Sequence, residues 1–584
     1  MNSRRTDTLR RVFATAPLVL VLALCGMTTA CRNREIPPEV SQIIKSTVET
    51  QTLPASIKDE KERARAWDEM RRFYNKRQYS PAWVTNQGLR PQAQELLQAI
   101  DGTVAEGLEP GRYQRDQLAA LVKEIEETRS YDDPEAQRRL AYADMHLTYS
   151  YLTLAAHVAT GRQQPGTLRI DWYTKPRNVD LDARLEKALA DEGGLVESLR
   201  TLRPPEEGYK PLVDALNRYR EIARNGGWPT VPAGELKQGA RGPAVAALQA
   251  RLRAEGDLAG ETGQAQPQPQ DAVYDQALAG AVAAFQKRHG LDPTGVVDAD
   301  TLADLNVPVE TRLQQIQLNL ERWRWMPSDL GERYIRVNIP EFKMALVEGG
   351  KPALEMRVVV GKAQQNRTPV FSDKMTYLEL NPSWNLPPEI VAEEIVPESG
   401  GDPGYLARKN LQVVRGYDDP QPVDPYSVDM AQLGSKGSPY RLRQPPGPDN
   451  PLGQVKFMFP NEHDIYLHDT PADHLFAKEE RAFSHGCIRL ERPMELAHVL
   501  LKGSEWTPEK LQSVLASGEQ TTVSLPKPLP VHLLYFTAWV DESGTVQFRR
   551  DVYGHDTRLA KALAEEPPVE LDFDAVRGQV RAAM

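Results

Sequence analysis

The sequence predicts a multidomain α+β protein, with a helical N-terminal half followed by a mostly β C-terminal domain. Three observations predict this class. The chain has 584 residues, too many for one hydrophobic core, and domains of about 100–200 residues suggest about three or four units. Apolar residues follow a helical spacing up to about residue 325. From about residue 332 the spacing changes to the alternation that is typical of strands.

Composition and charge limit the partners of the chain. Hydrophobic residues make up 40% and charged residues 26%, which are ordinary values for globular domains. The formal net charge is -10 at pH 7. Such an acidic balance argues against a nucleic acid or an anionic lipid surface as the main partner, because both carry negative charge.

The first 31 residues have the pattern of an export signal. Arginines precede an apolar run from Ala14 to Leu24, and small residues then lead to Cys31. The run has the length of a signal-peptide core and is short for a membrane span. The residues before Cys31 are typical of a lipoprotein processing site, although Thr28 stands where Leu is usual. We therefore expect lipidation of Cys31, with a plain secretory signal cleaved nearby as the alternative.

Cysteine usage indicates a special role for one residue. The chain has three cysteines, at positions 25, 31 and 487. Removal of the signal and lipidation of Cys31 would leave Cys487 as the one free thiol of the mature protein. Exported proteins normally pair their cysteines as disulfides, so a lone thiol indicates a reactive group. A buried cysteine acting as a small hydrophobe is the competing interpretation.

The N-terminal half divides into a linker and a helical region. Residues 32–60 are polar and contain Pro37-Pro38, so we expect a linker there. Residues 61–232 follow a helical pattern, with one long helix predicted from Pro134 to Thr160. No catalytic arrangement of residues is visible in this region, and we interpret it as a helical scaffold.

Residues 233–307 are predicted to form a small three-helix unit. The three helices are indicated by apolar residues at helical spacing, namely Val245, Leu248 and Leu252, then Val282, Phe285 and His289, then Thr301, Leu302 and Leu305. A stretch rich in Gln, Pro and Gly, Gly260–Gln270, predicts a loop after the first helix. A connecting helix from Val309 to Trp325 is expected within residues 308–331.

Residues 332–556 are predicted to be a mostly β domain. Strands are expected at 334–339, 344–347, 356–360, 375–380, 455–459, 464–468, 531–540 and 546–548. A segment rich in Pro, Gly and charge, residues 393–443, interrupts them, and a long insertion near a site often acts as a lid. Residues 557–584 are expected to form a C-terminal tail.

Two segments of the β domain carry the chemistry, residues 465–470 and 484–490. His468 ends one predicted strand and Cys487 begins the next apolar stretch, so adjacent strands can bring the two within hydrogen-bond reach. A free thiol has a pKa of about 8.5, and a neighbouring imidazole can take its proton to leave a thiolate–imidazolium pair. Cys487 is therefore the candidate nucleophile and His468 the candidate general base.

The residues around Cys487 fit the same chemistry. Gly486 lets the backbone approach the thiol closely, and N–H groups around it can hold the oxyanion of an acyl-transfer intermediate. Such a donor contributes roughly 3–4 kcal/mol in the transition state. Arg489 lies one strand period beyond Cys487, so we expect it on the same face, binding a substrate carboxylate or fixing the loop.

Two alternatives for this site are open. His485 is nearer to Cys487 in the sequence and is the alternative base. A zinc site is the other alternative, with His463, His468, His485 and Cys487 as possible ligands. No paired C-x-x-C or H-E-x-x-H spacing supports zinc, and we expect neither a metal nor an organic cofactor.

The motifs resemble two known families. The pattern His468…Ser484-His485-Gly486-Cys487-x-Arg489 resembles the active-site signature of L,D-transpeptidase (YkuD-type) catalytic domains. NPSWNLP at 381–387, LGQVKFMFPN at 452–461, YLHDTP at 466–471 and DVYGHD at 551–556 extend the likeness. LKQGARGPAVAALQARL, AVAAFQKRHGL and TGVVDADTLADLN, within residues 233–307, resemble the three-helix peptidoglycan-binding module. Together with a helical scaffold and a capping insertion, the chain is similar to the long Gram-negative form of the murein L,D-transpeptidases.

This resemblance implies roles for the site residues. Cys487 would be the nucleophile, His468 the general base and Gly486 part of the oxyanion hole. The backbone around Asp469 would orient the imidazole, and Arg489 would give electrostatic support. The residues expected to bind substrate or shape the site are Tyr466, Ser484, His485, Trp384 and Asn385.

The resemblance also implies a reaction. Cys487 would attack the carbonyl at the L-centre of diaminopimelate in a tetrapeptide stem and expel the terminal D-Ala. The thioester would pass to the side-chain amine of another stem, forming a 3→3 cross-link in cell wall biogenesis, and carbapenems would acylate the same thiol. A lipoprotein lysine, a D-amino acid or water is the alternative acceptor, and a non-catalytic wall-binding scaffold is the alternative function.

The expected partners and location follow. Peptidoglycan would be the substrate, and the three-helix module would bind glycan or only stiffen the protein. We expect a periplasmic protein held by a lipid anchor on Cys31, in the outer rather than the inner membrane.

Overall fold

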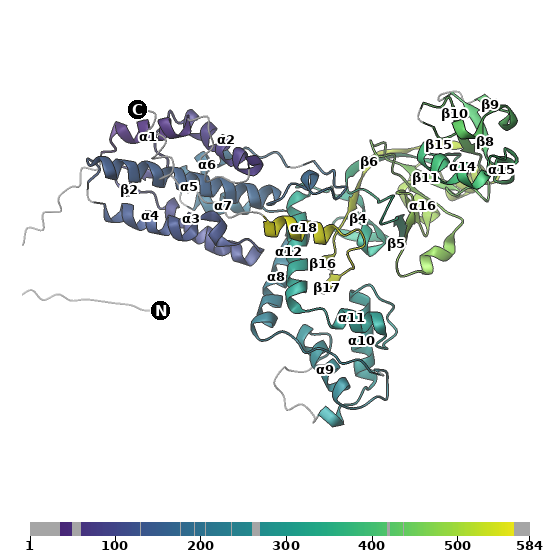
Figure 1. The fold of residues 1–584 in the computed structure, drawn as a ribbon, viewed down its shortest axis with the longest axis horizontal. Coiled ribbons are helices and arrows are strands. Elements are labelled where there is room, and N and C mark those ends of the chain that lie inside the picture. Colours follow the sequence, from purple (N-terminus) through teal and green to yellow (C-terminus); the bar gives the residue numbers. More distant parts are fainter. Residues whose placement is uncertain are drawn as a thin grey trace, which may run out of the picture.

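Three arms meet at one central helix, α12 (Val309–Trp325) (Figure 1). They are a helical domain, a three-helix module and a β domain with a small capping subdomain at its far end. The computed structural model describes residues 35–49 and 60–565, apart from residues 129, 176, 192, 205, 235, 260–268, 417–420 and 436 and the side chains of residues 60–65, 206 and 207. The predicted export signal with Cys31, and most of the predicted loop Gly260–Gln270, lie outside the described residues.

The helical domain is built around one long helix, α5 (Pro134–Thr160). Asp133 caps its start by accepting a hydrogen bond from the N–H of Ala136 at 3.0 Å, and Pro134 stands at the first turn, where no N–H is needed. The bounds agree with the helix that the sequence predicts. Around α5 pack α1 (Pro38–Val48), α2 (Glu60–Lys76), α3 (Gln92–Gly102), α4 (Arg115–Glu127) and α6 (Leu181–Ala190), with α7 (Gly194–Arg200) against α3 and α6.

Helix α1 corrects the predicted linker over residues 32–60. Val40, Ile44 and Val48 follow one another at four-residue spacing, and all three are buried against the core of the helical domain. Four-residue spacing places them on one face of a helix, and that single apolar stripe is enough to hold it against α5. The polar residues that suggested a linker cover the exposed side of α1. No described helix has both the length and the apolarity that a membrane span needs.

The three-helix module consists of α9 (Pro243–Glu255), α10 (Gln276–Arg288) and α11 (Ala299–Leu305). Side-chain caps start two of the helices: Asp275 accepts from the N–H of Leu278 and Asp298 from the N–H of Thr301, both at 2.8 Å. The spacing that predicted the three helices is confirmed, because Val245, Leu248, Leu252, Val282, Phe285 and Leu305 form the module's core.

Helix α8 (Glu206–Arg224) packs on α12, although the sequence placed it in the helical scaffold. Tyr209, Leu212 and Leu216 of α8 share a core with Ile316 and Leu320 of α12. The short strands β16 (Ala538–Val540) and β17 (Val546–Phe548) join the same core. Helix α12, predicted as a simple connection, is therefore the element on which the arms are assembled.

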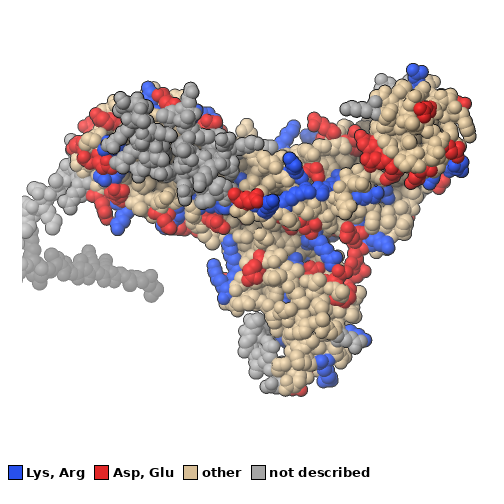
Figure 2. Space-filling model, in the orientation of Figure 1, with Lys and Arg blue, Asp and Glu red and all other residues tan. Residues whose placement is uncertain are grey.

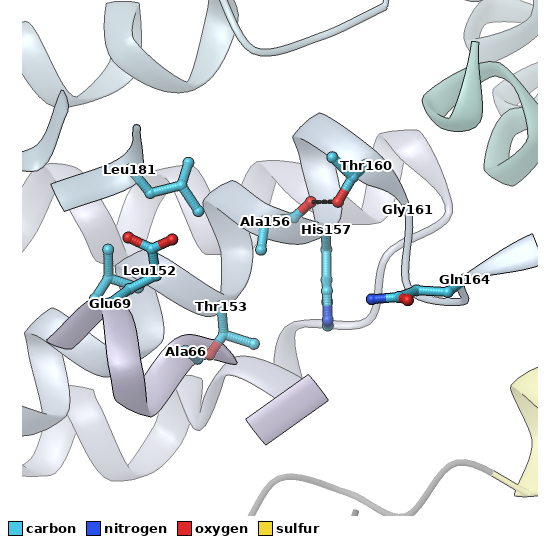
Figure 3. A pocket seen from close by; sticks show the side chains of 10 residues that line it. All are labelled: Ala66, Glu69, Leu152, Thr153, Ala156, His157, Thr160, Gly161, Gln164 and Leu181. Carbon is cyan, nitrogen blue, oxygen red and sulfur yellow. Dashed lines mark hydrogen bonds between the residues drawn. The ribbon is translucent and has the colours of Figure 1, made fainter. Parts of the chain in front are cut away.

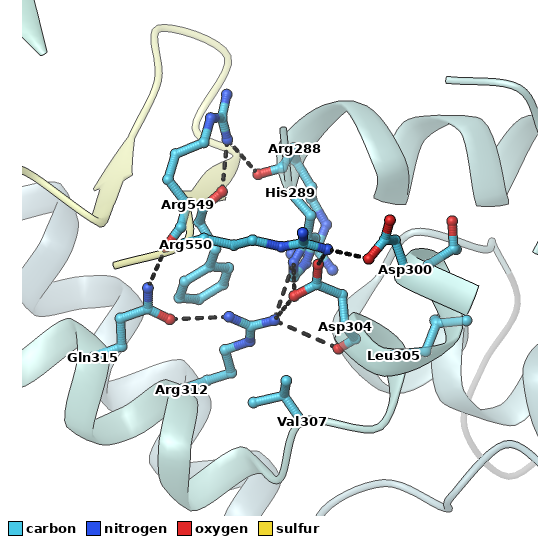
Figure 4. A network of polar contacts seen from close by, with 12 residues as sticks. Arg288, His289, Asp300, Asp304, Leu305, Val307, Arg312, Gln315, Arg549 and Arg550 are labelled. Carbon is cyan, nitrogen blue, oxygen red and sulfur yellow. Dashed lines mark hydrogen bonds and ion pairs between the residues drawn. The ribbon is translucent and has the colours of Figure 1, made fainter. Parts of the chain in front are cut away.

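Buried polar contacts fix the three-helix module to α12 and to the β domain (Figure 4). Arg312 of α12 donates to Asp304 of α11 at 2.8 Å. Arg549, just after β17, donates to the carbonyl of Arg288 at 2.9 Å. Arg550 donates to Asp300 at 2.8 Å on the exposed rim. Contacts from α12 and from the β domain thus both hold the three-helix module in place.

A curled nine-stranded sheet forms the β domain. Its strands are β3 (Arg333–Asn338), β4 (Lys343–Glu348), β5 (Lys351–Gly361), β6 (Ser372–Leu380), β11 (Val455–Met458), β12 (Leu467–His468), β13 (Ala482–Ser484), β14 (Ile488–Leu490) and β15 (Thr521–Leu534). The order is β13-β5-β14-β12-β11-β6-β15-β3-β4, and β4 also pairs with β5, so the sheet closes on itself. Apolar side chains fill its inside, and helices α16 (Pro493–Leu500) and α17 (Pro508–Ser517) pack against it.

The predicted insertion is a subdomain with a core of its own. Strands β7 (Trp384–Asn385), β8 (Gln412–Arg415), β9 (Gln421–Val423) and β10 (Tyr440–Gln444) form a sheet in the order β7-β10-β8-β9. Leu386, Leu406, Val413 and Leu442 are buried beneath it. This sheet begins at Trp384, before the predicted start of the insertion at residue 393, because β7 pairs with β10 across the base of the subdomain.

The predicted C-terminal tail, residues 557–584, is partly wrong. Helix α18 (His555–Glu565) packs on α12, and its Leu559 is fully buried. Residues 566–584 lie outside the described residues. On the face that Figure 2 shows, acidic and basic side chains are interspersed over all three arms rather than gathered into one basic stripe.

Candidate active site

Three neighbouring strands bring the predicted site residues to one face of the sheet. Strand β12 pairs in parallel with β14, with His468 opposite Arg489, and antiparallel with β11, with His468 opposite Lys456. Side chains alternate along a strand, so Tyr466 lies on the side of His468, and Cys487 on the side of Arg489. The pairing of these strands thus places Tyr466, His468, Cys487 and Arg489 on one face of the sheet. The sequence predicts this shared face for Cys487 and Arg489.

The sulfur of Cys487 contacts the segment before β12 most closely. Its Sγ lies 3.6 Å from the carbonyl oxygen of Asp464. Burial raises the pKa of the Cys487 thiol, while hydrogen bonds from the main chain and the hydroxyl of Tyr466 act in the opposite direction. Cys487 is also the one cysteine that the described part of the chain contains. Tyr466 is therefore a direct neighbour of the sulfur.

His468 is buried, and one of its ring nitrogens is already committed. Nδ1 lies 2.5 Å from the carbonyl oxygen of Asp469, which fits donation from Nδ1–H and leaves the Nε2 lone pair free to accept a proton. Burial, followed by the cation of Arg489, lowers the pKa of His468 to about 3, with a smaller contribution from Lys456.

The two pKa shifts have the same consequence for the resting state of the pair. A raised pKa of the thiol and a lowered pKa of the imidazole both favour the neutral thiol and neutral imidazole over a thiolate–imidazolium pair. In the described part of the chain no hydrogen bond joins His468 to Cys487. Hydrogen bonds of catalytic groups often tighten only when substrate binds.

Asp469 fixes the backbone behind the histidine. Its carboxylate accepts from the N–H of Gln454 at 2.7 Å and from the N–H of Thr470 at 2.8 Å. Gly453 approaches so closely that a Cβ there would lie 2.2 Å from Asp469 Oδ2, and its φ of +60° suits glycine. The carboxylate of Asp469 thus fixes the segment of backbone whose carbonyl orients His468.

The loop before Cys487 is closed by Ser484. Its Oγ donates to the carbonyl of Cys487 at 2.6 Å and accepts from the N–H of Gly486 at 3.1 Å. This second bond corrects the expected role of Gly486, because its N–H is not free to bind an oxyanion. The N–H of Cys487, in contrast, donates to nothing within the described residues.

His485 contacts the capping subdomain. Its Nε2 lies 2.6 Å from Glu394 Oε1, and Glu394 belongs to the helical turn Val391–Ile395. With Nε2 engaged by a carboxylate, His485 is less suited than His468 to act as the base, although it remains beside the thiol in the sequence. The insertion is thereby linked to the loop that carries Cys487.

The remaining predicted residues lie as follows. Arg489 is largely buried, burial lowers its pKa, and its Nε has no hydrogen-bond partner in the described structure. Trp384 packs against the core of the capping subdomain, and Asn385 pairs with Arg443 of β10. These last two residues belong to the base of the capping sheet.

Sequence reasoning missed three residues around the site. Lys456 lies opposite His468, and its Nζ stands 4.1 Å from the centre of the Tyr466 ring. The alternation of side chains along β11 would have indicated the face of the sheet on which Lys456 lies, but not that His468 lies opposite it. Glu394 comes from the helical turn Val391–Ile395, and Thr368, from the segment between β5 and β6, donates to the carbonyl of Gly486. Both are far from Cys487 in the sequence, and no local pattern signals them.

A pocket in the helical domain is separate from this site (Figure 3). It lies between α2, α5 and the turn after α5, and its lining includes Glu69, Thr153 and His157. None of the lining residues belongs to the β domain. Among the described residues, no group of three or more His, Cys, Asp or Glu side chains is arranged to hold a metal ion.

The site contains a thiol, a histidine with an oriented ring, and a main-chain N–H that has no partner among the described residues, which are groups that cysteine acyl transfer uses. Three family models match the chain. Residues 332–511 match "L,D-transpeptidase catalytic domain", residues 241–305 match "Putative peptidoglycan binding domain" and residues 68–216 match "Scaffold domain". Residues 332–511 thus match the catalytic domain that the sequence motifs resemble, which confirms the resemblance for this part of the chain.

Individual proteins are similar to parts of the chain. A Haemophilus influenzae protein named "Putative L,D-transpeptidase" is 37% identical over 264 residues. The match covers 45% of this chain and 51% of that protein, so the chain spans about half the length of its relative. Crystal structures of L,D-transpeptidases from Stackebrandtia nassauensis and Xylanimonas cellulosilytica each cover 52% of this chain, and 96% and 98% of their own chains. Their identities to the chain are 14% and 16%, and their TM-scores are 0.20 and 0.16.

Proposed function

We propose that the chain is an L,D-transpeptidase that acts on peptidoglycan through a thioester on Cys487 and forms 3→3 cross-links. The observation that carries the proposal is the commitment of His468 Nδ1 to the carbonyl of Asp469, on the sheet face that also carries Cys487. That hydrogen bond fixes the tautomer in which Nε2 can take a proton. The matched catalytic domain supports the same chemistry.

The first half of the reaction makes the acyl-enzyme. Cys487 Sγ attacks the carbonyl at the L-centre of diaminopimelate in a tetrapeptide stem, and His468 Nε2 takes the thiol proton. The N–H of Cys487 is the main-chain donor available to the oxyanion. When the tetrahedral intermediate collapses, the C–N bond breaks and Nε2–H protonates the leaving amine of D-Ala, which leaves a thioester on Cys487.

The second half releases the product. The side-chain amine of a second stem attacks the thioester carbonyl and gives its proton to His468 Nε2. The C–S bond breaks, and the proton returns to the sulfur of Cys487, so the thiol and the neutral imidazole are both restored. No electron transfer takes place, and the atoms balance over the two steps.

The charges around the site suit a substrate with free carboxylates. Lys456 and Arg489 flank His468 on the same sheet face, and the stem peptide ends in the carboxylate of D-Ala. The same cations disfavour a positive charge on the imidazole, so they favour the neutral base that the first step requires. Tyr466 and the Glu394–His485 contact border the thiol, and the capping subdomain would act as the lid over the substrate.

The proposal places the protein in the cell envelope. The export pattern of residues 1–31 supports a periplasmic location with a lipid on Cys31, and the module at residues 241–305 supports attachment to peptidoglycan. The mass of the mature N-terminal peptide tests the anchor. A lipid-modified Cys31 supports it, and an unmodified N-terminus cut nearby replaces it with a plain secretory signal.

The test of function is intact-protein mass after incubation with a carbapenem and, separately, with a defined tetrapeptide donor. Wild type is compared with Cys487→Ala and His468→Ala, and with His474→Ala as a matched control for an exposed histidine. We expect one adduct on wild type and on the control, none on Cys487→Ala and a slow adduct on His468→Ala. Absence of any adduct on folded, reduced wild type would overturn the proposal.

Product analysis identifies the acceptor. With purified stem peptides, a dimer joined through two diaminopimelate residues supports the 3→3 cross-link. Release of a tripeptide indicates water as the acceptor, and incorporation of an added D-amino acid or of a lipoprotein lysine indicates those acceptors instead.

A further inference from the structure

A threonine from another loop holds the peptide group next to the nucleophile. Thr368 lies between β5 and β6 and is fully buried. Its Oγ1 donates to the carbonyl oxygen of Gly486 at 2.6 Å and accepts from the N–H of Gly361 at 2.9 Å. One hydroxyl therefore connects the end of β5 to the loop that carries Cys487.

This contact fixes the direction of the unpartnered N–H of Cys487. The carbonyl of Gly486 and the N–H of Cys487 belong to the same planar peptide group, and in a trans peptide they point in opposite directions. The structure contains no cis peptide among its described residues. When Thr368 holds the carbonyl, it thereby sets where the N–H of Cys487 points.

The loop around Thr368 packs tightly against Gly361 and lies in contact with Gly486. A Cβ placed on Gly361 would lie 1.9 Å from the carbonyl oxygen of Asn366. A Cβ on Gly486 would meet the carbonyl oxygens of Arg367 and Asn366 at 3.8 and 3.9 Å, and Gly486 has a φ of +114°, which glycine adopts readily. The loop thus forms a wall behind the peptide group of Gly486 and Cys487.

Thr368 is held in turn by a motif near the C-terminus. Tyr553 OH donates to the carbonyl of Gly361 at 2.6 Å and accepts from the N–H of Thr368 at 3.3 Å. The N–H of Tyr553 donates to Tyr535 OH at 2.8 Å, and Tyr535 OH donates to Asp551 at 2.7 Å. Tyr535 and Tyr553 are buried, and both lie beyond residues 332–511, which match the catalytic domain family.

The helical domain holds the other end of the same loop. The N–H of Val370 donates to the carbonyl of Asp171 at 2.8 Å, and the N–H of Tyr173 donates to the carbonyl of Val370 at 2.7 Å. These two bonds form a parallel bridge between the segment after α5 and the loop. The loop of Thr368 is therefore set from two parts of the chain outside the matched catalytic domain.

We propose that Thr368 is a positioning residue for acyl transfer, which orients the Gly486–Cys487 peptide so that the Cys487 N–H meets the oxyanion, and that Tyr553 holds Thr368 in place. The inference deepens the proposed function and rests on it for the identity of the natural substrate. The geometric part applies to any acyl donor that forms an oxyanion at Cys487.

The test compares Thr368→Val with Thr368→Ser in the full chain. Valine keeps the shape of threonine without the hydroxyl, and serine keeps the hydroxyl. Acyl transfer is measured with p-nitrophenyl acetate and with the tetrapeptide donor. We expect kcat of Thr368→Val to fall about 10- to 100-fold with little change in KM, below the 10²–10³-fold loss on removal of an oxyanion donor. Thr368→Ser should keep most of the activity.

Alkylation of Cys487 by iodoacetamide, followed from pH 6 to 10, gives the second readout. Alkylation forms no oxyanion, so Thr368→Val should keep the wild-type rate and pH profile. Equal loss of alkylation and acyl transfer would mean that the thiol itself is displaced, and would overturn the inference. Wild-type kcat with both acyl donors in Thr368→Val would overturn it as well.

Tyr553→Phe tests the outer contact with a matched control. It should lower kcat less than Thr368→Val does, because Thr368 keeps its bond to Gly486. Tyr274→Phe removes an equivalent buried bond, from a tyrosine hydroxyl to the carbonyl of Gly295 at 2.8 Å in the three-helix module, and should leave kcat unchanged. Equal kcat for Tyr553→Phe and wild type would remove Tyr553 from the inference. If wild type transfers acetyl groups but no stem peptide, the proposed function fails while the role of Thr368 is still decided.

Discussion

The three-helix module and the active site both bury charged groups, but only the module pairs them with opposite charges. Within the module, Arg288 contacts Glu255 at 2.7 Å and Asp257 at 2.5 Å, and Arg251 contacts Glu255 at 2.5 Å. At the active site, Arg489 and His468 share a face, and no carboxylate pairs with either side chain among the described residues. Removing one partner of a buried ion pair leaves the other charge uncompensated, whereas a charge without a counter-ion shifts the pKa of its neighbours.

The pKa values express the same difference. Burial raises the pKa of the Glu255 carboxyl, but Arg288 and Arg251 outweigh it and hold this pKa well below its usual range. Burial and the cation of Arg489 act together on His468 and lower its pKa to about 3. Changes to this charged cluster of the three-helix module should therefore alter stability, and changes at the site should alter activity.

His468→Gln should give the largest effect on activity with little loss of stability. Removing the base should lower kcat for acyl transfer about 10²–10⁴-fold. The free energy of unfolding at pH 7 should stay close to that of wild type, since Gln can still donate to the carbonyl of Asp469. Steady-state kinetics and urea unfolding of the same preparation measure both. A folded variant with wild-type kcat would remove His468 from the mechanism.

Glu255→Gln should show the opposite pattern. The change leaves the buried cations of Arg251 and Arg288 short of a counter-charge, which typically costs about 3–5 kcal/mol in the free energy of unfolding. The kcat of the folded protein should not change. Glu197→Gln is the control, because Glu197 forms an exposed pair with Arg200 and should have little effect on urea unfolding. Equal stability of the two variants would contradict the comparison.

Acid should destabilise the protein through its buried histidines. The pKa of His468 is lowered to about 3 and that of His555 to about 2, both chiefly by burial, whereas a histidine in the unfolded chain titrates near 6.5. Below pH 6.5 the unfolded chain binds more protons than the folded one. The stability is therefore complete above about pH 6.5 and falls as the pH drops toward 3, by a few kcal/mol.

Urea unfolding between pH 7 and 4 checks this dependence. His468→Gln should flatten it, and His474→Gln, at an exposed histidine, should not. A wild-type stability that stays constant down to pH 5 would contradict the lowered pKa values.

Lys456→Met should give the smallest effect. It removes one of the two cations that lower the pKa of His468, so this pKa should rise, by less than the change that loss of Arg489 would give. NMR titration of the histidine ring measures it. Lys510→Met, at an exposed lysine, should leave the titration of His468 unchanged. A pKa that falls, or does not move, would show that Lys456 does not act on His468.

Local signals in the sequence predicted much of the fold. The helices Pro134–Thr160 and Val309–Trp325 have the bounds that were predicted, because side-chain caps, proline and helical spacing act within a few residues. The strand of His468 was predicted as residues 464–468 but pairs only over Leu467–His468, since the preceding residues turn to reach Cys487. Helix α1 was missed because three apolar residues are few among many polar ones.

The sequence by itself predicted an L,D-transpeptidase catalytic domain, with Cys487 and His468 as its candidate nucleophile and base. Only the tertiary structure decided which residues contact and orient the groups of the site. It assigned the N–H of Gly486 to Ser484, placed Lys456 opposite His468 and brought Thr368 to the carbonyl of Gly486. Strand register and loop packing join residues far apart in the chain, so no local pattern contains them. The same reason explains why α12, predicted as a connection, became the centre of the molecule.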